Sequence, residues 1–240
     1  MNKYQKSADF LETLSSNPYP GRGIMVGTSA DGKKAVVAYF IMGRSVNSRN
    51  RIFSEEPDGI RTEAFDPSKM VDPSLIIYHP VRLYNGELIV TNGDQTDTIR
   101  DFRADGKSFE EALRTRCFEP DGPNWTPRIS AVLAKDGSYK MSILKAYDEE
   151  GSACLRQTFE YPVTPGCGHF LHTYETDGSP IPSFAGEPEK VTFAGELEDF
   201  AQAVWHALNR DNKVSLYVAF RDLESGEIET CIINKHPEEK

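Results

Sequence analysis

The chain has 240 residues, of which 38% are hydrophobic and 27% are charged. This length allows a sizeable core, and the composition is that of an ordinary globular protein. The 27 basic and 37 acidic residues give a net charge of −10, which disfavours non-specific binding to nucleic acid or to an anionic membrane. An anionic ligand must therefore be held by a focused site.

Targeting and redox signals are absent from the sequence. No apolar run approaches the roughly 20 residues that a membrane span requires, and no apolar signal segment follows the first lysines. We therefore expect a cytoplasmic protein with no membrane partner. The four cysteines show no C-x-x-C spacing, so neither a zinc ribbon nor a secreted disulfide framework is indicated, and we expect reduced thiols.

Pairs of predicted strands flank short turns that contain glycine, which supplies the positive φ of a tight hairpin turn. These pairs are 22–28 with 34–42, 75–84 with 87–91, 128–133 with 139–146, and 214–222 with 228–234. The apolar run 35–42 predicts a strand buried on both faces. The segments 54–72 and 178–188 are polar and rich in proline and glycine, and we predict them to be long loops.

Three helices are predicted. Ser108 and Glu111 have the spacing of a capping box, which predicts a helix that runs to about residue 118. Apolar residues between 197 and 208 fall on one helical face, and residues 7–14 form a third, short helix. Hairpins with few helices between them predict an α+β protein with stacked antiparallel sheets covered by helices. We expect an N-terminal extension over residues 1–20 and a single domain over residues 21–240.

A cluster of arginines follows directly on the buried strand. Arg44, Arg49 and Arg51 lie within eight residues of one another. Guanidinium groups bind phosphate and carboxylate bidentately, so these side chains indicate a local anion site in an otherwise acidic protein. The alternative is a solvated loop whose arginines pair with surface acids, and the segment alone does not decide between the two.

Further polar segments stand at predicted strand ends. The side chains of residues 91–97 could hold a ribose or a base edge, although a plain turn explains Asn92-Gly93-Asp94 equally well. Pro127 fixes the approach of the chain to the next strand, so that Arg128 takes a defined position. The segment 170–175 ends in a tyrosine and a carboxylate.

The one histidine and cysteine cluster is not predicted to bind metal. If residues 167–172 form a strand, Cys167 and His169 share a face and His172 points to the other, so we expect structural histidines. The sequence also contains no glycine-rich phosphate loop, no G-x-S-x-G elbow and no H-E-x-x-H motif. The standard cofactor folds are therefore not indicated.

Taken in order, these segments resemble the archaeal-type inosine monophosphate (IMP) cyclohydrolase family. The resemblance rests on the segments 21–28, 39–51, 91–97, 126–129 and 173–175. The ordered set is specific, whereas each segment alone is weak. Archaeal members have Pro-Asn where this chain has Asn47-Ser48, and the first twenty residues and the long loop near Gly178 suggest the bacterial branch.

The resemblance implies a four-layer αββα sandwich of antiparallel sheets, similar to the N-terminal nucleophile hydrolases. It implies the last step of purine biosynthesis, in which 5-formamidoimidazole-4-carboxamide ribonucleotide closes to IMP with loss of water. This reaction needs no covalent nucleophile, metal or cofactor. The expected partner is thus a small-molecule nucleotide, and a homo-oligomer is compatible with the size of the chain.

The resemblance also implies roles for single residues. Arg44 is expected to position the substrate or to stabilise the oxyanion, Tyr78 to donate a proton, and Glu119 to act as general base or acid. Arg49 and Arg51 are available to the 5′-phosphate. The other expected substrate-binding residues are Asn92, Asp94, Thr96, Asp97, Thr126, Arg128, Tyr174 and Glu175.

Two other functions stay open. A purine-nucleotide-binding protein on the same fold would have kept the pocket without catalysis, but Glu119 and Tyr78 remain beside the arginines. An amidohydrolase on this scaffold would need Cys, Ser or Thr freed at the start of a strand by self-cleavage. The first strand of the family pattern begins at Arg22-Gly23-Ile24 instead, which disfavours that chemistry.

Overall fold

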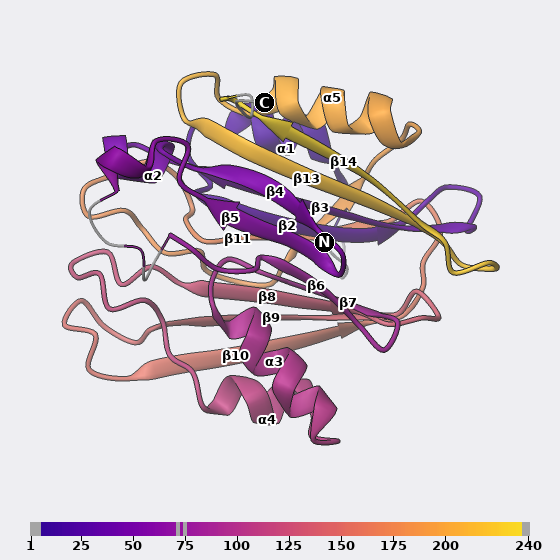
Figure 1. The fold of residues 1–240 in the computed structure, drawn as a ribbon, viewed down its shortest axis with the longest axis horizontal. Coiled ribbons are helices and arrows are strands. Elements are labelled where there is room, and N and C mark those ends of the chain that lie inside the picture. Colours follow the sequence, from indigo (N-terminus) through magenta and orange to yellow (C-terminus); the bar gives the residue numbers. More distant parts are fainter. Residues whose placement is uncertain (1–5, 71–72, 74–75, 237–240) are drawn as a thin grey trace.

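Two seven-stranded sheets stack on one another in the computed structural model, which describes residues 6–70, 73 and 76–236 (Figure 1). The first sheet has the strand order β1-β12-β11-β2-β3-β13-β14. Its strands are β1 (Ala8–Asp9), β2 (Arg22–Thr28), β3 (Lys34–Met42), β11 (Gly168–His172), β12 (Glu189–Thr192), β13 (Lys213–Asp222) and β14 (Ile228–Asn234). Neighbouring strands are antiparallel except β1 and β12, which are parallel.

The second sheet is antiparallel throughout, with the order β10-β9-β8-β7-β6-β5-β4. Its strands are β4 (Ile52–Glu56), β5 (Gly59–Glu63), β6 (Val81–Tyr84), β7 (Glu87–Thr91), β8 (Arg128–Leu133), β9 (Tyr139–Ala146) and β10 (Cys154–Tyr161). The chain crosses from one sheet to the other between β3 and β4 and returns between β10 and β11. Both crossings matter below, because functional side chains lie on or beside them.

Helices cover the outer faces of both sheets (Figure 1). The first sheet carries α1 (Phe10–Ser16) and α5 (Leu197–Ala207), and the second carries α3 (Gln95–Ala104) and α4 (Phe109–Arg114). Two short elements, α2 (Val46–Arg49) and the 3₁₀ helix η1 (Pro67–Lys69), lie in connections. The layers are therefore helix, sheet, sheet, helix, and the coarse prediction of an α+β protein with stacked antiparallel sheets is confirmed.

Strand β3 shows why the two sheets stack. Its side chains alternate between the faces of the sheet. Tyr39 and Ile41 pack in the core between the sheets, whereas Ala38 and Phe40 pack against the helices on the outer face. All four are at most 1% exposed. The prediction of a strand buried on both faces is thus confirmed, and removal of this apolar surface from water is what holds the layers together.

The four predicted hairpins are confirmed as antiparallel pairs, including β2 with β3 and β8 with β9. One predicted strand is too long, because β6 begins at Val81 rather than at residue 75. Residue 75 lies outside the described residues, and Pro80, directly before the strand, has no N–H to donate. The prediction of a loop over 54–72 is wrong at its start, where the end of β4 and all of β5 form a hairpin through the turn at residues 57–58. The loop predicted over 178–188 contains no helix or strand.

The predicted helices need smaller corrections. The capping box at Ser108 is present, but α4 ends at Arg114 rather than near residue 118. The short N-terminal helix covers residues 10–16 rather than 7–14. Helix α3 was not predicted, because it is polar along most of its length and buries only Gln95, Thr96 and Ile99.

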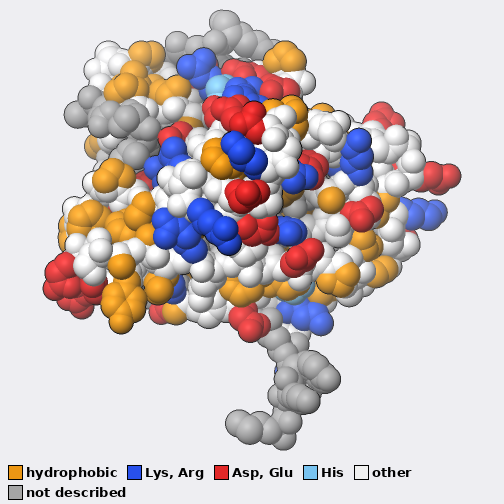
Figure 2. Space-filling view, turned by 90° about the horizontal axis from the view of Figure 1, so that it is seen from below, with side chains coloured by type: hydrophobic (Ala, Val, Ile, Leu, Met, Phe, Trp, Pro, Cys, Tyr) orange, Lys and Arg blue, Asp and Glu red, His pale blue; other side chains and the backbone are white. Residues whose placement is uncertain are grey.

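Charge is distributed without a dominant patch on the face that carries α3 and α4. Figure 2, seen from below the view of Figure 1, shows basic and acidic side chains interspersed over this face. In the part of the chain that the structure describes, no helix is long and apolar enough to cross a membrane.

Helix α1 is docked on the first sheet and leads into β2. Phe10 is fully buried and contacts the rings of Phe170 and Phe200, with centroid separations of 5.2 and 6.2 Å. The helix ends at Ser16, and residues 17–21 connect it to β2. The docked helix therefore fixes the position from which this connection starts.

We expect the substitution Phe10→Ala to lower the free energy of unfolding by about 3–5 kcal/mol, as is usual when a buried phenylalanine is truncated. Chemical denaturation checks this value. The control is Ser15→Ala on the exposed side of the same helix, which should change stability by no more than about 0.5 kcal/mol. Equal stability of the two variants would show that α1 does not hold this position in solution.

Candidate functional site

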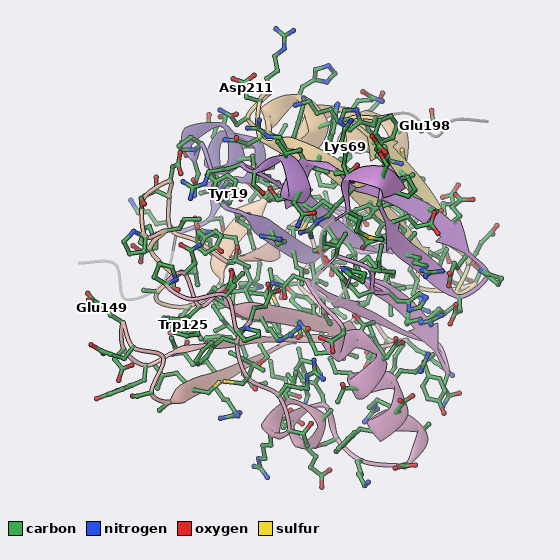
Figure 3. All side chains as sticks on the ribbon, turned by 60° about the vertical axis from the view of Figure 1, so that its left-hand side comes forward. Tyr19, Lys69, Trp125, Glu149, Glu198 and Asp211 are labelled. Carbon is green, nitrogen blue, oxygen red and sulfur yellow. The ribbon has the colours of Figure 1, made fainter. Side chains whose placement is uncertain are left out.

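A cleft of about 310 Å³ opens at one end of the stacked sheets. It lies where β2 begins, where the β3–α2 connection leaves the first sheet, and where the loops before β8 and after β11 meet. In Figure 3, Tyr19 and Trp125 are labelled on this side of the molecule, with Tyr19 nearer the first sheet and Trp125 nearer the second. The volume is at the lower end of the range for small-molecule sites.

Two buried arginines form part of the cleft wall. Arg22, the first residue of β2, is 9% exposed, and Arg51, directly before β4, is 5% exposed. Their Nε atoms are buried without a hydrogen-bond partner, and neither side chain forms an ion pair within 4 Å among the described residues. Two unpaired guanidinium groups in this position favour an anionic ligand.

The two guanidinium groups differ in their electrostatics. Burial alone would lower the pKa of Arg22, but the negative charge of Glu119 raises it overall. The pKa of Arg51 is lowered, first by burial and then by the positive charge of Arg22. The two charges therefore repel each other across the same wall, and an anion bound between them would relieve the repulsion.

Glu119 is the buried carboxyl group of the cleft, with 6% exposure. Burial raises its pKa, and the charges of Arg22 and Arg128 offset only part of this effect. Its backbone N–H donates to the carbonyl of Thr126 at 2.9 Å, which ties it to the loop before β8. A carboxyl group with a raised pKa in a ligand-sized cleft is suited to proton transfer near neutral pH.

The loop from residue 119 to residue 126 is rigidly braced. Trp125 has a φ of +43°, a strained conformation for a bulky residue, and its indole N–H donates to the carbonyl of Glu149 at 2.9 Å. Gly122 and Gly151 lie against the indole ring, where a Cβ atom would come within 2.8 Å of it. The absence of side chains at these two glycines lets the indole hold the loop in place.

A chain of hydrogen bonds crosses the cleft from this loop to the first sheet. Thr126 donates its backbone N–H to Asp121 at 2.7 Å and its hydroxyl to the same carboxylate. The Thr126 and Tyr174 hydroxyl oxygens are 2.6 Å apart. Tyr174 stacks on Tyr19, with ring centroids 5.9 Å apart. Burial raises the pKa of Tyr174 to about 12, so the phenol keeps its proton at neutral pH.

Arg44 lies at the rim of the cleft. It forms an ion pair with Asp177, donates to the carbonyl of Gly178 at 2.8 Å, and stands 5.1 Å above the ring of Tyr19. Its side chain is 37% exposed. Arg44 thus joins the β3–α2 connection to the loop after β11 at the mouth of the cleft.

The sequence-predicted site residues fall into three groups. Arg44, Arg51, Glu119, Thr126 and Tyr174 line the cleft together. Tyr78 and Arg128 lie next to it. The Tyr78 hydroxyl is 3.1 Å from that of Tyr39, and the Tyr78 side chain lies near both buried arginines.

Arg128 is held from the side of the second sheet. Its guanidinium group donates to Gln95 at 2.7 Å and pairs with Asp94 at 2.8 Å. Asp94 also pairs with Arg116. The carboxylate of Asp94 is therefore engaged by two arginines, and Arg128 acts on the cleft through its charge on Glu119.

The remaining predicted residues lie outside the cleft lining. Arg49 donates to the carbonyl of Gly43 at 2.8 Å and to Asn212 at 3.2 Å. Asn92 accepts from the backbone of Ile129 and donates to the carbonyl of Pro127, each at 2.8 Å. The hydroxyl of Thr96 bonds that of Thr91 at 2.7 Å, and Glu175 is exposed.

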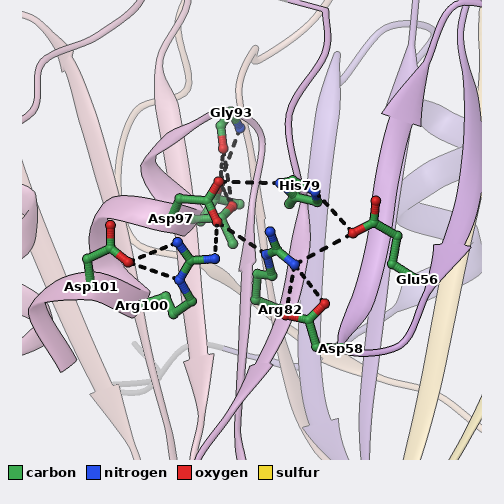
Figure 4. Close-up of polar contacts among 10 residues, drawn as sticks. Glu56, Asp58, His79, Arg82, Gly93, Asp97, Arg100 and Asp101 are labelled. Carbon is green, nitrogen blue, oxygen red and sulfur yellow. Dashed lines mark hydrogen bonds and ion pairs between the residues drawn. The ribbon is translucent and has the colours of Figure 1, made fainter. Parts of the chain in front are cut away.

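Asp97 belongs to a separate charge network (Figure 4). It contacts His79 at 3.3 Å, Arg82 at 3.2 Å and Arg100 at 3.0 Å. Arg82 pairs in turn with Asp58 at 2.6 Å. The network links the β4–β5 hairpin to α3, so these charges are engaged in holding the second sheet and its helix.

Several cleft residues were not predicted from the sequence as site residues, namely Tyr19, Arg22, Ser45, Asn47, Ser48, Ile76, Asp121, Asn124 and Ile181. The sequence does indicate that Arg22 is unusual, because it is an arginine at the first position of a wholly buried and mostly apolar strand. Asp121 carried none, since it stands in a turn rich in proline and glycine.

Metal ligation is not indicated by the described residues, which contain no cluster of three or more His, Cys, Asp or Glu side chains that could hold a metal ion. His172 is bonded within the protein, to the carbonyl of Tyr174 at 2.7 Å and to Glu189 at 2.8 Å. His169 is 2.6 Å from the hydroxyl of Tyr139.

Comparison with known proteins gives one family. The model of the family described as IMP cyclohydrolase-like protein matches residues 19–226. Over 221 residues the chain is 28% identical to the IMP cyclohydrolase of Halobacterium salinarum, which covers 90% of this chain and 98% of the relative. It is 27% identical to that of Methanococcus aeolicus over 196 residues, or 78% and 92% of the two chains, and 34% identical to that of Methanopyrus kandleri over 182 residues, or 69% and 89%.

We expect inorganic phosphate to stabilise the protein through the arginines of the cleft. Phosphate at tenfold its dissociation constant adds about 1.4 kcal/mol, which corresponds to a rise in Tm of about 3–5 °C for a chain of this size. The substitution Arg51→Met should reduce this rise, because it removes one of the cations of the cleft. It should not lower the Tm of the free protein, because it also removes the repulsion with Arg22.

The matched comparison is Arg49→Met, two residues away and outside the cleft, which should leave the phosphate-induced rise in place. Differential scanning fluorimetry measures both. An equal rise in the two variants would show that the anion binds elsewhere.

Proposed function

The chain belongs to the IMP cyclohydrolase-like family, and we propose that it closes 5-formamidoimidazole-4-carboxamide ribonucleotide to IMP with loss of water in purine biosynthesis. The observation that carries this proposal is a buried carboxyl group, Glu119, in a nucleotide-sized cleft beside two buried arginines, Arg22 and Arg51. The similarity to the two IMP cyclohydrolases covers 92% and 98% of the length of those relatives.

The reaction forms one bond and breaks another. The carboxamide nitrogen attacks the formyl carbon, the carbonyl electrons move to the formyl oxygen, and the nitrogen loses a proton. The resulting oxyanion takes up a proton to become a hydroxyl group. This hydroxyl takes up a second proton and leaves as water, while the formamido nitrogen loses its N–H proton and forms the C=N bond of the closed ring. The site must therefore hold two groups of one substrate in contact, stabilise an oxyanion and transfer protons.

Glu119 carries the proton in this mechanism. As a carboxylate it accepts the proton from the attacking nitrogen, and as a carboxylic acid it gives a proton to the leaving hydroxyl. Its raised pKa supports both roles, since burial makes the carboxylate a stronger base than an exposed glutamate and favours the protonated form that donates to the leaving group.

Arg22 and Arg51 stabilise the negative charge that develops on the formyl oxygen. They are buried, their Nε atoms lack partners among the described residues, and they act electrostatically on Glu119. Hydrogen-bond donors that are fixed in a buried site stabilise negative charge far more than the same donors do in water. Tyr78, hydrogen-bonded to Tyr39 behind this wall, is the proposed source of a further proton.

Arg44 binds the 5′-phosphate at the rim. Its side chain is partly exposed and pairs with Asp177, so it can exchange that carboxylate for a phosphate. The residues that lie outside the cleft lining, such as Arg49, Asn92 and Asp97, support the site from behind. Their side chains are already bonded within the protein.

We also propose that the four layers are those of the N-terminal nucleophile hydrolases. Two stacked antiparallel sheets with helices on both outer faces support this assignment. The strand at which such an enzyme would carry its nucleophile begins here with Arg22, which suits a ring closure that needs no covalent intermediate. Residues 1–20 are then an extension of one catalytic domain over residues 21–240.

The purified protein is expected to convert the formamido ribonucleotide to IMP with no metal or cofactor added. Chromatography follows the product, and heat-inactivated protein gives the uncatalysed rate. If no product forms but the nucleotide raises Tm, the protein binds purine nucleotides without catalysis. If neither occurs, the proposed function is wrong.

The substitution Glu119→Gln should lower kcat by about 10²–10⁴-fold, the usual contribution of a general base. Because the base must be ionised, kcat of the wild type should fall as the pH falls through the raised pKa of Glu119, and the variant should lack this limb. Steady-state pH profiles measure both effects.

The control for that substitution is Glu198→Gln on the exposed side of α5, which should keep the wild-type profile. An acidic limb that persists in Glu119→Gln would assign the proton transfer to another group.

A further inference from the structure

One set of cleft contacts is not used by the mechanism above. Asp121, Thr126 and Tyr174 all line the cleft, and none of them belongs to the pair of arginines or to Glu119. The backbone N–H and the hydroxyl of Thr126 both bond the Asp121 carboxylate, and the Thr126 hydroxyl oxygen is 2.6 Å from that of Tyr174. The three residues thus form a chain that begins in the loop before β8 and ends on the first sheet.

The chemistry of these groups fixes the direction of the chain. An ionised carboxylate can only accept hydrogen bonds, so the single proton of the Thr126 hydroxyl is given to Asp121. The threonine oxygen then has only lone pairs left for Tyr174. The tyrosine proton must therefore point at Thr126, and it is unavailable to a ligand.

We propose that Asp121 is a positioning residue which, through Thr126, turns Tyr174 into a hydrogen-bond acceptor for the nucleotide. The lone pairs of the Tyr174 oxygen then select an N–H or O–H donor on the ligand. This acceptor complements the guanidinium groups of Arg22 and Arg51 in the same cleft, which carry only donors. The inference rests on the proposed function, because the nucleotide is taken as the ligand.

Selectivity follows from the cost of an unsatisfied group. If the ligand offered an acceptor at this point, two sets of lone pairs would face each other in a buried site. Of the groups on IMP, the ring N1–H and the ribose hydroxyls are donors. The Tyr174 oxygen thus accepts a hydrogen bond either from the closed ring or from the sugar. Analogues that lack one donor at a time distinguish these two possibilities.

The test is a double-mutant cycle on IMP binding, measured by isothermal titration calorimetry. Thr126→Val and Tyr174→Phe should each raise Kd about tenfold, the value of one lost hydrogen bond. The double variant should bind no more weakly than either single variant, because Thr126 acts only through the Tyr174 hydroxyl. Thr126→Ser should regain most of the affinity that Thr126→Val loses, since it restores the hydroxyl.

Analogues supply the second readout. One of the analogues 1-methyl-IMP, 2′-deoxy-IMP and 3′-deoxy-IMP should bind the wild type about tenfold more weakly than IMP, and this difference should vanish in Tyr174→Phe. If Thr126 only supported the structure, its substitution would weaken the binding of IMP and of every analogue equally. It would not remove the effect of one particular donor on the ligand. The matched control is Thr158→Val, at an exposed position of β10, which should bind IMP as the wild type does.

Two results would overturn the inference. The first is additivity, in which the affinity of the double variant for IMP falls about a hundredfold. The second is equal affinity of the wild type for IMP and all three analogues. Failure of the proposed function gives a different result, since the wild type would then neither bind IMP nor form it.

Discussion

The cleft depends on one electrostatic constraint, which is that two arginines are buried side by side without full compensation. Burial of a charge costs several kcal/mol unless partners offset it, and here the charge of Arg22 also disfavours that of Arg51. Glu119 supplies part of the compensation and has its own pKa raised by burial. Such a site is stabilised by an anionic ligand, or by negative charge that develops during a reaction.

The stacking of the sheets holds these charges together. Arg22 opens β2 of the first sheet, and Arg51 stands directly before β4 of the second. The loop of Glu119 and Thr126 leads into β8 of the second sheet, whereas Tyr174 follows β11 of the first. Each sheet thus contributes both a cation and a polar group, and the apolar core between the sheets sets the distance across the cleft.

Much of the fold could be predicted from the sequence, because the hairpins depend on local signals. The Asp136-Gly137 turn specifies the pairing of β8 with β9, and the apolar run of β3 specifies burial on both faces. Helix α3 escaped prediction because its stability comes from contacts with the second sheet rather than from its own sequence pattern. The hairpin of β4 and β5 was hidden because its strands are short and mostly polar.

The site was less predictable than the fold, for physical reasons. Which of the arginines near residue 44 enter the cleft is decided by how the chain turns in α2, which sends Arg51 inward and ties Arg49 to Gly43. Asp121 lines the cleft because Trp125 and two glycines shape its loop. Such tertiary effects leave no pattern in the sequence around each residue.

We propose that the buried arginines stabilise the transition state rather than merely hold the nucleotide. The most direct measurement is the single-turnover rate of ring closure in Arg51→Met at saturating substrate, with Arg61→Met, at a partly exposed position of β5 outside the cleft, as control. The account predicts a slowing of about 10²-fold or more, with the control near the wild-type rate. A single-turnover rate within about twofold of wild type, with only KM raised, would show uniform binding instead and would contradict the claim.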